Sequence, residues 1–397
     1  MPTSTQKMTS RERVLAAVRR QPIDHLPLCF EGVGHTWVEF VSRLYPDPFE
    51  RARFYLDLDV DTAVNLGNLP LSTAGFEVKE WQEHPADEPC PLLVKEYITP
   101  RGSLRQVVRK TEDYPHASVP LMSDHHVPPS RSVQYLVEKE EDLGKLEYIF
   151  RPPDDEELRA YYRQAKEARK FCDDHGILLT ARLPGVGDVL IWLSGIVPVL
   201  LAAMDEPGFI QRYVNIISSW DMANLERHID AGVDLVIRRG WYEGTDFWSP
   251  RLFREFLFDP LKREIEVAHQ AGVLFTYIMN SGAMPLLDMF VELGLDIHGC
   301  VDPLAGNTDL ARMKREEGER ITLYGGVNNN LVVERGSTEQ VREGVRQAAE
   351  TLAPGGGYIM GTGDSVMCAD QTARRNFYEM INAWKELRDA FGQTKGA

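Results

Sequence analysis

The sequence of 397 residues contains few cysteines and no long hydrophobic run. No stretch of about 18 uncharged apolar residues occurs, so we expect no membrane-spanning helix. The first nine residues lack the apolar core of a secretion signal. The five cysteines are scattered and have no CxxC spacing, which argues against a disulfide framework and favours free thiols. We therefore expect a cytoplasmic protein with no membrane partner.

The chain also lacks a basic stripe. It has 60 Asp and Glu residues against 44 Lys and Arg residues, which gives a formal net charge of −16. Proteins that bind the phosphate backbone cluster Lys and Arg, so nucleic acid is not an expected partner. No GxGxxG motif follows the first predicted strand, which weakens the hypothesis of a dinucleotide-binding fold.

What the sequence does contain is a repeating alternation of apolar strands and helical patterns. Eight strands that alternate with helices predict an α/β fold of the (β/α)8 TIM barrel type, with catalytic residues at the C-terminal ends of the strands. An open doubly wound sheet is the competing architecture. The predicted strands cover residues 25–32, 61–68, 177–185, 233–243, 273–282, 295–302, 321–329 and 357–364, and the predicted helices cover residues 10–20, 155–173, 207–231, 250–270, 284–292, 308–316, 338–352 and 370–391.

One region interrupts this alternation. Residues 76–111 contain three short β-type segments with a turn at Pro100-Arg-Gly102, which predicts a β-meander inserted after the second strand. An irregular segment rich in Pro and His follows. We interpret residues 76–130 as a lid or docking surface within a single domain that spans residues 1–397.

The segment Asp296-Ile-His-Gly-Cys-Val-Asp302 places an imidazole, a thiol and a carboxylate at alternate positions of a predicted strand. Alternate side chains of a strand share one face, so His298 and Cys300 predict a zinc site or a reactive thiolate. Asp364, at the end of the eighth predicted strand, would complete a metal shell with His298 and Cys300, and Glu243 is another possible ligand. The alternative is a core cysteine beside a hydrogen-bonded histidine.

Three residues are candidates for catalysis: Glu243, Asp364 and His298. Glu243 follows the aromatic pair Trp241-Tyr242, and desolvation that raised its pKa would let it protonate a leaving alkoxide. The alternative is a loop carboxylate that caps the next helix. Asp364 lies among glycines, which let a ligand approach the backbone. It can serve as an acid, a metal ligand or a helix cap.

Other polar residues at the ends of strands are candidates for substrate binding. Arg238 and Arg239 resemble an anion clamp, but adjacent residues of a strand face opposite sides, so at most one of them points inward. The substrate-binding candidates are Glu31, His35, Asn68, Tyr277, Met279, Asn280 and Asn328.

The chain contains, in this order, the motifs Thr9-Ser-Arg-Glu-Arg-Val-Leu-Ala-Ala17 with Pro22-Ile-Asp-His-Leu-Pro27, Ser249-Pro-Arg-Leu-Phe-Arg-Glu-Phe256, Leu323-Tyr-Gly-Gly-Val-Asn328 and Gly355-Gly-Gly-Tyr-Ile-Met360. This ordered set of motifs resembles the uroporphyrinogen decarboxylase superfamily. The resemblance runs over nearly the whole chain, and it implies a (β/α)8 barrel with one active-site cleft. Porphyrinogen decarboxylases share that barrel with methyltransferases that move methyl groups to or from a corrinoid on a partner protein.

Departures from the family pattern argue against porphyrinogen decarboxylation. The arginine motif that binds the substrate's carboxylates is replaced by Glu31-Gly-Val-Gly-His35, in which a glutamate would repel a polyacid. Asn68 and Asp364 replace two further functional residues of the decarboxylases. The zinc ligands of the methyltransferase branch align with Met279-Asn-Ser281 and Asp364, so that zinc site is absent at its usual positions.

The resemblance therefore favours a methyltransferase that demethylates a small O-, N- or S-methylated compound and passes the methyl group to cob(I)alamin. The corrinoid would be carried by a separate protein, since the chain has no Asp-x-His-x-x-Gly segment. The barrel would position the methyl group, and zinc or a protonated carboxylate would activate the leaving atom. The alternatives are a decarboxylase or lyase that acts on a different substrate, and a binding barrel without catalytic activity.

Overall fold

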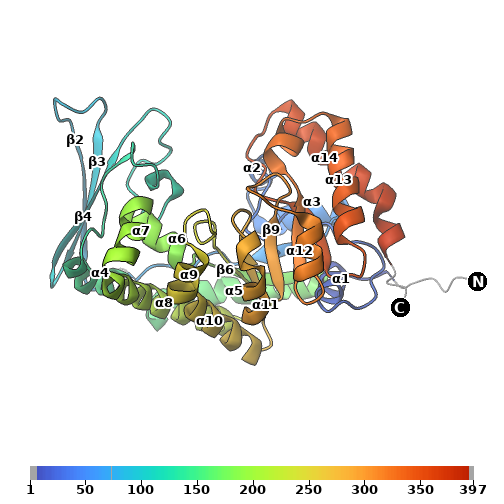
Figure 1. Cartoon of the computed structure of the whole chain (residues 1–397), viewed down its shortest axis with the longest axis horizontal. Coiled ribbons are helices and arrows are strands. Elements are labelled where there is room, and N and C mark those ends of the chain that lie inside the picture. Colours follow the sequence, from blue (N-terminus) through green and yellow to red (C-terminus); the bar gives the residue numbers. More distant parts are fainter. Residues whose placement is uncertain (1–6, 73, 393–397) are drawn as a thin grey trace, which may run out of the picture.

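The structure, a computed structural model, describes residues 7–72 and 74–392 and has an α/β fold (Figure 1). Seven parallel strands form one curled sheet whose order follows the chain. The sheet is buried by helices, as expected of parallel strands. Its strands are β1 (Ala63–Asn65), β6 (Leu178–Leu183), β7 (Leu235–Arg238), β8 (Leu274–Ile278), β9 (Ile297–Val301), β10 (Thr322–Val327) and β11 (Tyr358–Thr362).

Residues 27–29 connect the two edges of this sheet, in the region where the sequence predicts a first strand. Leu28 makes an isolated parallel bridge to Met360 of β11, and Cys29 makes one to Asp61, next to β1. Met360 N donates to the Pro27 carbonyl at 2.9 Å, and Asp61 N donates to the Leu28 carbonyl at 2.8 Å. Pro27 has no N–H of its own to continue a ladder. The predicted first strand is therefore reduced to two bridges, and the arrangement is TIM-barrel-like.

Helices surround the sheet, and side chains cap several of their N-termini. Thr9, Asp154 and Ser337 each form a capping box, which pairs backbone N–H groups that would otherwise lack partners. The helices are α1 (Ser10–Val18), α2 (Glu39–Leu44), α3 (Pro48–Asp57), α4 (Leu143–Ile149), α5 (Asp155–His175), α6 (Val186–Ser194), α7 (Ile196–Asp205), α8 (Pro207–Asp230), α9 (Pro250–Leu252), α10 (Phe258–Gln270), α11 (Leu287–Leu293), α12 (Leu310–Glu316), α13 (Thr338–Leu352) and α14 (Gln371–Leu387), with short 3-10 or π turns η1 (Asp124–His126), η2 (Glu140–Asp142), η3 (Phe253–Leu257), η4 (Met284–Leu286), η5 (Asn329–Glu334) and η6 (Arg388–Phe391).

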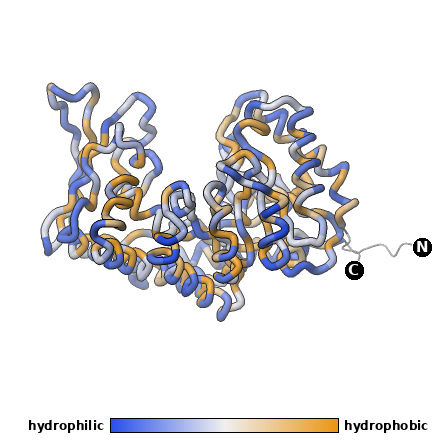
Figure 2. Tube along the Cα trace, in the orientation of Figure 1, coloured by the Kyte–Doolittle hydropathy of each residue, from blue (hydrophilic) through white to orange (hydrophobic). Residues whose placement is uncertain are grey.

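A separate antiparallel sheet follows β1 in the chain and lies on the opposite side of the molecule from α12, α13 and α14 (Figure 1). The predicted meander is present, and its hairpin pairs Thr99 with Gly102. The edge strand β2 is largely exposed and hydrophilic (Figure 2), and charged residues on an edge strand oppose pairing with other chains. The sheet consists of β2 (Glu77–Glu83), β3 (Leu92–Thr99), β4 (Gly102–Arg109) and β5 (Ser132–Gln134).

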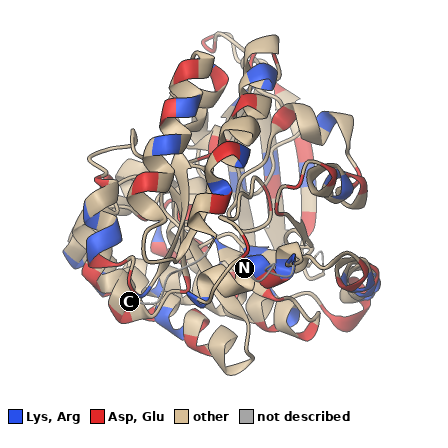
Figure 3. Cartoon of the chain, turned by 90° about the vertical axis from the view of Figure 1, so that its right-hand side faces the viewer, with Lys and Arg blue, Asp and Glu red and all other residues tan. Residues whose placement is uncertain are grey.

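The helices range from the apolar pair α6 and α7 to outer helices rich in charged residues (Figure 3). No single helix of the described residues is long and apolar enough to cross a membrane; α6 and α7 meet that test only as a pair, and the pair is bent by 109°. Charged residues of both signs are mixed along the outer helices (Figure 3). Arg342 of α13, for example, pairs with Glu379 and Glu386 of α14.

Candidate functional site

A cavity of about 380 Å³, which we call the mouth cavity, lies beyond the C-terminal ends of β7 and β11. Its walls come from four separate parts of the chain. Active sites of TIM barrels form in this way, from segments that follow different strands. The lining residues are His35, Trp37, Asp124, Arg239, Trp241, Tyr242 and Asp364.

Asp364 is a carboxyl group suited to proton transfer in the mouth cavity. It follows β11 closely, and its Oδ1 accepts a hydrogen bond from Ser365 N at 2.6 Å. Burial raises the pKa of Asp364 to about 6, although the Ser365 N–H and the charge of Arg239 act in the opposite direction. The protonated and ionised forms are therefore both populated near neutral pH, as general acid–base catalysis requires.

Asp124 brings the segment between β1 and β6 into the mouth cavity. Its Oδ1 accepts hydrogen bonds from Trp192 Nε1 at 2.8 Å and from Tyr242 OH at 3.0 Å. Arg239 Nη2 donates to the same oxygen at 3.2 Å. The Arg239 guanidinium also lies over the Trp192 ring, 4.7 Å from its centre, in a cation–π arrangement. These contacts fix Arg239 at the edge of the cavity.

His35 is a neutral histidine in the wall of the mouth cavity. Burial holds its pKa well below the usual value, and the charges of Arg182 and Arg239 lower it further. His35 Nε2 lies 3.3 Å from Arg239 Nη1. Since a guanidinium can only donate, a neutral ring accepts at Nε2 and carries its proton on Nδ1. His35 Nδ1 is buried and has no hydrogen-bond partner among the described residues.

Asp188, in α6, is a fully buried carboxyl group, located behind the loop that follows β7. Its Oδ1 accepts a hydrogen bond from Tyr242 N at 3.2 Å, and its Oδ2 has no partner in the described part of the chain. Burial raises the pKa of Asp188 to about 8, with Arg239 opposing and Glu243 adding to the rise. A protonated Asp188 avoids an uncompensated charge in the interior.

Glu243 belongs to a buried ionic network and not to the lining of the mouth cavity. Its Oε2 accepts hydrogen bonds from Arg238 Nη1 at 2.6 Å and from Tyr277 OH at 2.5 Å. Its Oε1 accepts from Gly187 N at 2.6 Å. Arg238 also donates to Glu264 of α10 at 2.7 Å. The structure therefore places Glu243 between the sheet and the outer helices, where it neutralises a buried arginine, and not at the position expected of the pocket acid.

His298 and Cys300 do not share a face, because β9 is irregular between them. The pairing of β9 with β10 shifts register there, and Cys300 has a φ of +64°, as in a β-bulge. His298 points to the helical layer: Nδ1 is 2.7 Å from Glu317 Oε1, and Nε2 is 3.0 Å from the Met279 carbonyl. Cys300 packs in the interior cluster of the sheet, where burial raises the pKa of its thiol well above the usual value.

The residues expected to hold zinc do not fit a zinc site. Both ring nitrogens of His298 are engaged in hydrogen bonds, and its side chain points toward the helical layer whereas Cys300 packs in the interior cluster. Zinc needs a free imidazole nitrogen and ligands that converge on one point. Within residues 7–72 and 74–392, no group of three or more His, Cys, Asp and Glu side chains is placed to hold a metal ion. No step proposed below uses a metal bound to His298, Cys300 and Asp364.

Of the residues expected to bind substrate, His35 is the one that lines the mouth cavity. Glu31 instead accepts hydrogen bonds from Arg51 Nε at 2.8 Å and from Tyr55 OH at 3.1 Å. Asn328 caps the η5 turn by accepting from Leu331 N. The remaining candidates lie outside the lining: Tyr277 and Met279 are buried in the core, Asn280 is partly buried and Asn68 is exposed.

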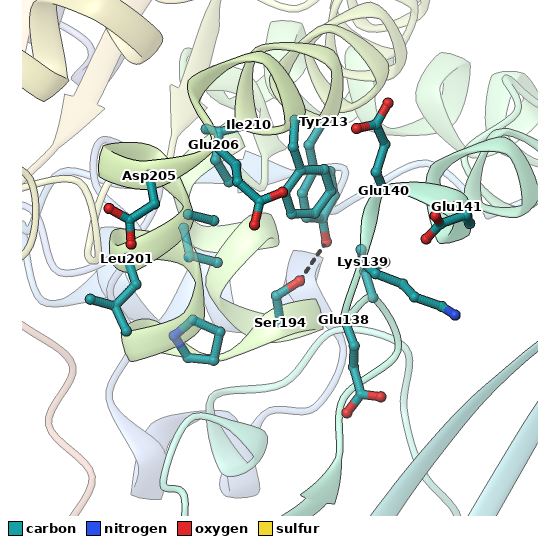
Figure 4. A pocket seen from close by; sticks show the side chains of 15 residues that line it. Glu138, Lys139, Glu140, Glu141, Ser194, Leu201, Asp205, Glu206, Ile210 and Tyr213 are labelled. Carbon is teal, nitrogen blue, oxygen red and sulfur yellow. Dashed lines mark hydrogen bonds between the residues drawn. The ribbon is translucent and has the colours of Figure 1, made fainter.

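Figure 4 shows a second cavity, of about 450 Å³, with Ser194 and Tyr213 among its lining residues. It is formed by α7, α8 and residues 137–141, and several carboxylates surround it. Ser194 Oγ and Tyr213 OH meet at its wall, 3.2 Å apart. None of its lining residues lies in a loop that directly follows a strand of the parallel sheet, so we do not assign the active site to it.

Several residues of the mouth cavity had no role in the sequence-based hypothesis. The sequence pointed to this part of the cavity only through the pair Arg238 and Arg239, of which at most one was expected to point inward. As expected for neighbours on a strand, Arg238 faces the helices and Arg239 faces the cavity. No sequence pattern indicated a role for Asp124, since it lies in an irregular segment whose path depends on tertiary contacts. Trp37, Trp241 and Tyr242 are aromatic residues in loops, which no spacing rule assigns to a cavity.

Comparisons with known proteins relate part of the chain to a known family. The family model for uroporphyrinogen decarboxylase (URO-D) matches residues 193–387, and no curated protein matches the chain. A methyltransferase from Methanosarcina mazei has a similar structure, with 16% sequence identity and a TM-score of 0.59 over 96% of this chain and 99% of that chain. A B12-independent methionine synthase from Shewanella sp. W3-18-1 is similar at 12% identity and a TM-score of 0.47, over 91% of this chain and 97% of that chain. Residues 193–387 therefore carry a domain of the uroporphyrinogen decarboxylase (URO-D) family.

Proposed function

We propose that the protein is a methyltransferase that demethylates a small O-, N- or S-methylated compound in the mouth cavity. The methyl group passes to cob(I)alamin on a separate corrinoid protein. The observation that carries this proposal is the partly buried Asp364 carboxyl group in a cavity with aromatic walls. The match of residues 193–387 to the URO-D family model supports an enzyme, and the chain of similar fold from Methanosarcina mazei is described as a methyltransferase.

Asp364 has the properties that demethylation requires of an acid. When the bond between the methyl carbon and an oxygen, nitrogen or sulfur breaks, the electron pair stays on the leaving atom, which then takes a proton. Cob(I)alamin supplies the nucleophile that accepts the methyl group, so the protein has to position the donor and supply that proton. Protonated Asp364 donates it and is reprotonated from solvent, since its pKa is about 6.

The walls of the mouth cavity position the donor. Trp37, Trp241 and Tyr242 offer flat apolar surfaces against which a small organic molecule can pack. Asp124 holds the Tyr242 hydroxyl and the Arg239 guanidinium in place. A cavity of about 380 Å³ falls within the size range of small-molecule sites.

The proposal is tested by methyl transfer to free cob(I)alamin, followed by absorbance, across a series of methylated oxygen, nitrogen and sulfur compounds. We expect Asp364→Asn to lower the rate by about 10²- to 10⁴-fold, since it removes the general acid. Asp389→Asn, which changes a carboxylate that is 81% exposed, serves as the control. Wild-type protein that transfers no methyl group from any donor class would contradict the proposal.

A decarboxylase or lyase is the second candidate, because Arg239 in the mouth cavity could hold a substrate carboxylate. Such a reaction releases carbon dioxide and needs no methyl acceptor. Measuring carbon dioxide release from carboxylated compounds without cobalamin separates the two functions. Release without methyl transfer would favour the lyase.

A further inference from the structure

Helix α7 presents an apolar stripe to solvent. Val197, Leu201 and Met204 are 59%, 55% and 64% exposed. They are spaced four and three residues apart, so they lie on one face of the helix. The helix carries no charge before its last residue, Asp205. Single exposed apolar side chains are ordinary, whereas a group of them on one face marks an interaction site.

The second cavity continues this stripe into a groove, which we call the α7 groove (Figure 4). Leu201 belongs to both surfaces, because it is exposed on α7 and lines the cavity. Phe209, Ile210 and Tyr213 of α8 form an apolar and aromatic wall, and residues 137–141 form the opposite rim. The groove has a volume of about 450 Å³, which leaves room for apolar side chains of another molecule.

The rim of the α7 groove is acidic. Lys139 is the one basic residue among the lining residues, against five acidic ones. Glu140 pairs with Arg212 of α8, and in the described part of the chain the other four acidic residues make no ion pair. The C-terminus of α7 adds the negative end of its helix dipole. The acidic residues are Glu138, Glu140, Glu141, Asp205 and Glu206.

We propose that the α7 groove binds a basic amphipathic helix of a partner protein. The apolar face of such a helix covers the stripe and fills the groove. Its Lys and Arg side chains lie against the unpaired carboxylates, which gives the contact its specificity. This inference goes beyond the proposed function, since it involves neither the mouth cavity nor a methyl donor.

The charge of the rim selects this occupant over two others. A symmetric contact between two copies of the chain uses the same patch on both, so that the acidic rims would lie against each other. A membrane surface rich in anionic lipids attracts Lys and Arg and repels carboxylates. A partner of positive charge meets neither obstacle.

The test uses two fluorescein-labelled peptides of about 14 residues, or four helical turns. Both place Leu along one helical face; the remaining positions are Lys in one peptide and Glu in the other. Fluorescence anisotropy measures the affinity of each for the whole protein. We expect the Lys peptide to bind at least about tenfold more tightly than the Glu peptide, and its affinity to fall with added salt.

Leu201→Gln distinguishes binding in the groove from general attraction of a basic peptide to an acidic protein, because the variant keeps the charge unchanged. We expect it to weaken binding of the Lys peptide by about tenfold or more, since it replaces the apolar residue at the centre of the stripe. Leu44→Gln, on α2, is the matched control because Leu44 is 57% exposed and does not line the groove. It should bind as the wild type does, and both variants should unfold at the wild-type temperature.

Failure of the Lys peptide to bind, equal affinity for the two peptides, or unchanged binding by Leu201→Gln would overturn the inference. Analytical ultracentrifugation tests for a second copy: a wild-type dimer that Leu201→Gln dissociates would also overturn it. So would sedimentation with phosphatidylglycerol vesicles that Leu201→Gln abolishes. Methyl transfer to free cob(I)alamin should be the same in Leu201→Gln and the wild type, so the inference and the proposed function fail independently.

Discussion

Arg239 donates a hydrogen bond to Asp124 across the mouth cavity at 3.2 Å, although 115 positions separate the two residues in the sequence. Trp192 and Tyr242 bind the same carboxylate oxygen. One side chain therefore joins the segment between β1 and β6 to the loop after β7. This segment is part of the site, and it sets the position of the arginine that faces the cavity.

Replacing Asp124 by alanine should loosen this connection. Three donors lose their acceptor, so we expect a higher KM for the methyl donor and faster amide hydrogen exchange in residues 114–130. The cost in unfolding free energy should be only about 1–2 kcal/mol, because the site is partly exposed. Asp113→Ala is the matched control, since Asp113 lies in the same segment and binds Arg131 instead. Equal KM values in the two variants would contradict the anchoring role.

The rate of methyl transfer should fall as pH rises through about 6. Burial raises the pKa of Asp364 to about 6, and a general acid works only in its protonated form. A plot of kcat/KM against pH should therefore show a descending limb near that value in the wild type. The same plot for the residual activity of Asp364→Asn should lack this descending limb. A wild-type rate that is independent of pH between 5 and 8 would exclude Asp364 as the acid.

The same pKa shift has a consequence for stability. The folded protein binds the Asp364 proton more tightly than the unfolded chain, whose pKa is near 3.8. The stabilisation from this proton is complete below that value and is lost as pH rises to about 6. Asp364→Asn should therefore gain up to about 3 kcal/mol over the wild type at pH 8 and less at pH 5. Urea unfolding at the two pH values measures this difference.

Much of the fold could be predicted from the sequence, because strands and helices leave a periodic pattern. Seven of the eight predicted strands contain a strand of the parallel sheet, and the hairpin around residues 99–102 is where its turn residues indicate. The segment at residues 25–32 was the exception. It is apolar, but Pro27 interrupts the ladder of N–H donors, and tertiary contacts reduce it to two bridges.

The site was harder to predict, because it depends on which way each side chain points. The alternation of side chains along a strand correctly predicts that Arg238 and Arg239 face opposite sides, since β7 is regular at that point. The same rule fails at His298 and Cys300, because a register shift in β9 turns one toward the helices and the other toward the interior. Asp124 could not be found by any periodic rule, since its segment is irregular.

Glu243 should matter for stability and not for the chemical step. Glu243→Gln leaves the fully buried Arg238 with Glu264 as its one ion-pair partner among the described residues, and breaking a buried ion pair costs about 3–5 kcal/mol. Urea unfolding measures this loss. Glu386→Gln, which breaks the exposed pair with Arg342, should cost less than about 1 kcal/mol. The activity per folded molecule of Glu243→Gln should stay within a few-fold of the wild type. A loss comparable to that of Asp364→Asn would instead place Glu243 in the chemistry.

Cys300 should be unreactive in the folded protein. Its side chain is fully buried, and burial together with the charges of Asp364 and Asp302 raises the pKa of the thiol well above the usual value. Alkylation requires the thiolate, so iodoacetamide should label the partly exposed Cys90 and Cys368 first. Mass spectrometry of peptides from protein labelled with and without urea measures the order. Rapid labelling of Cys300 in native protein would show that it is accessible and ionised, and would restore it as a candidate nucleophile or metal ligand.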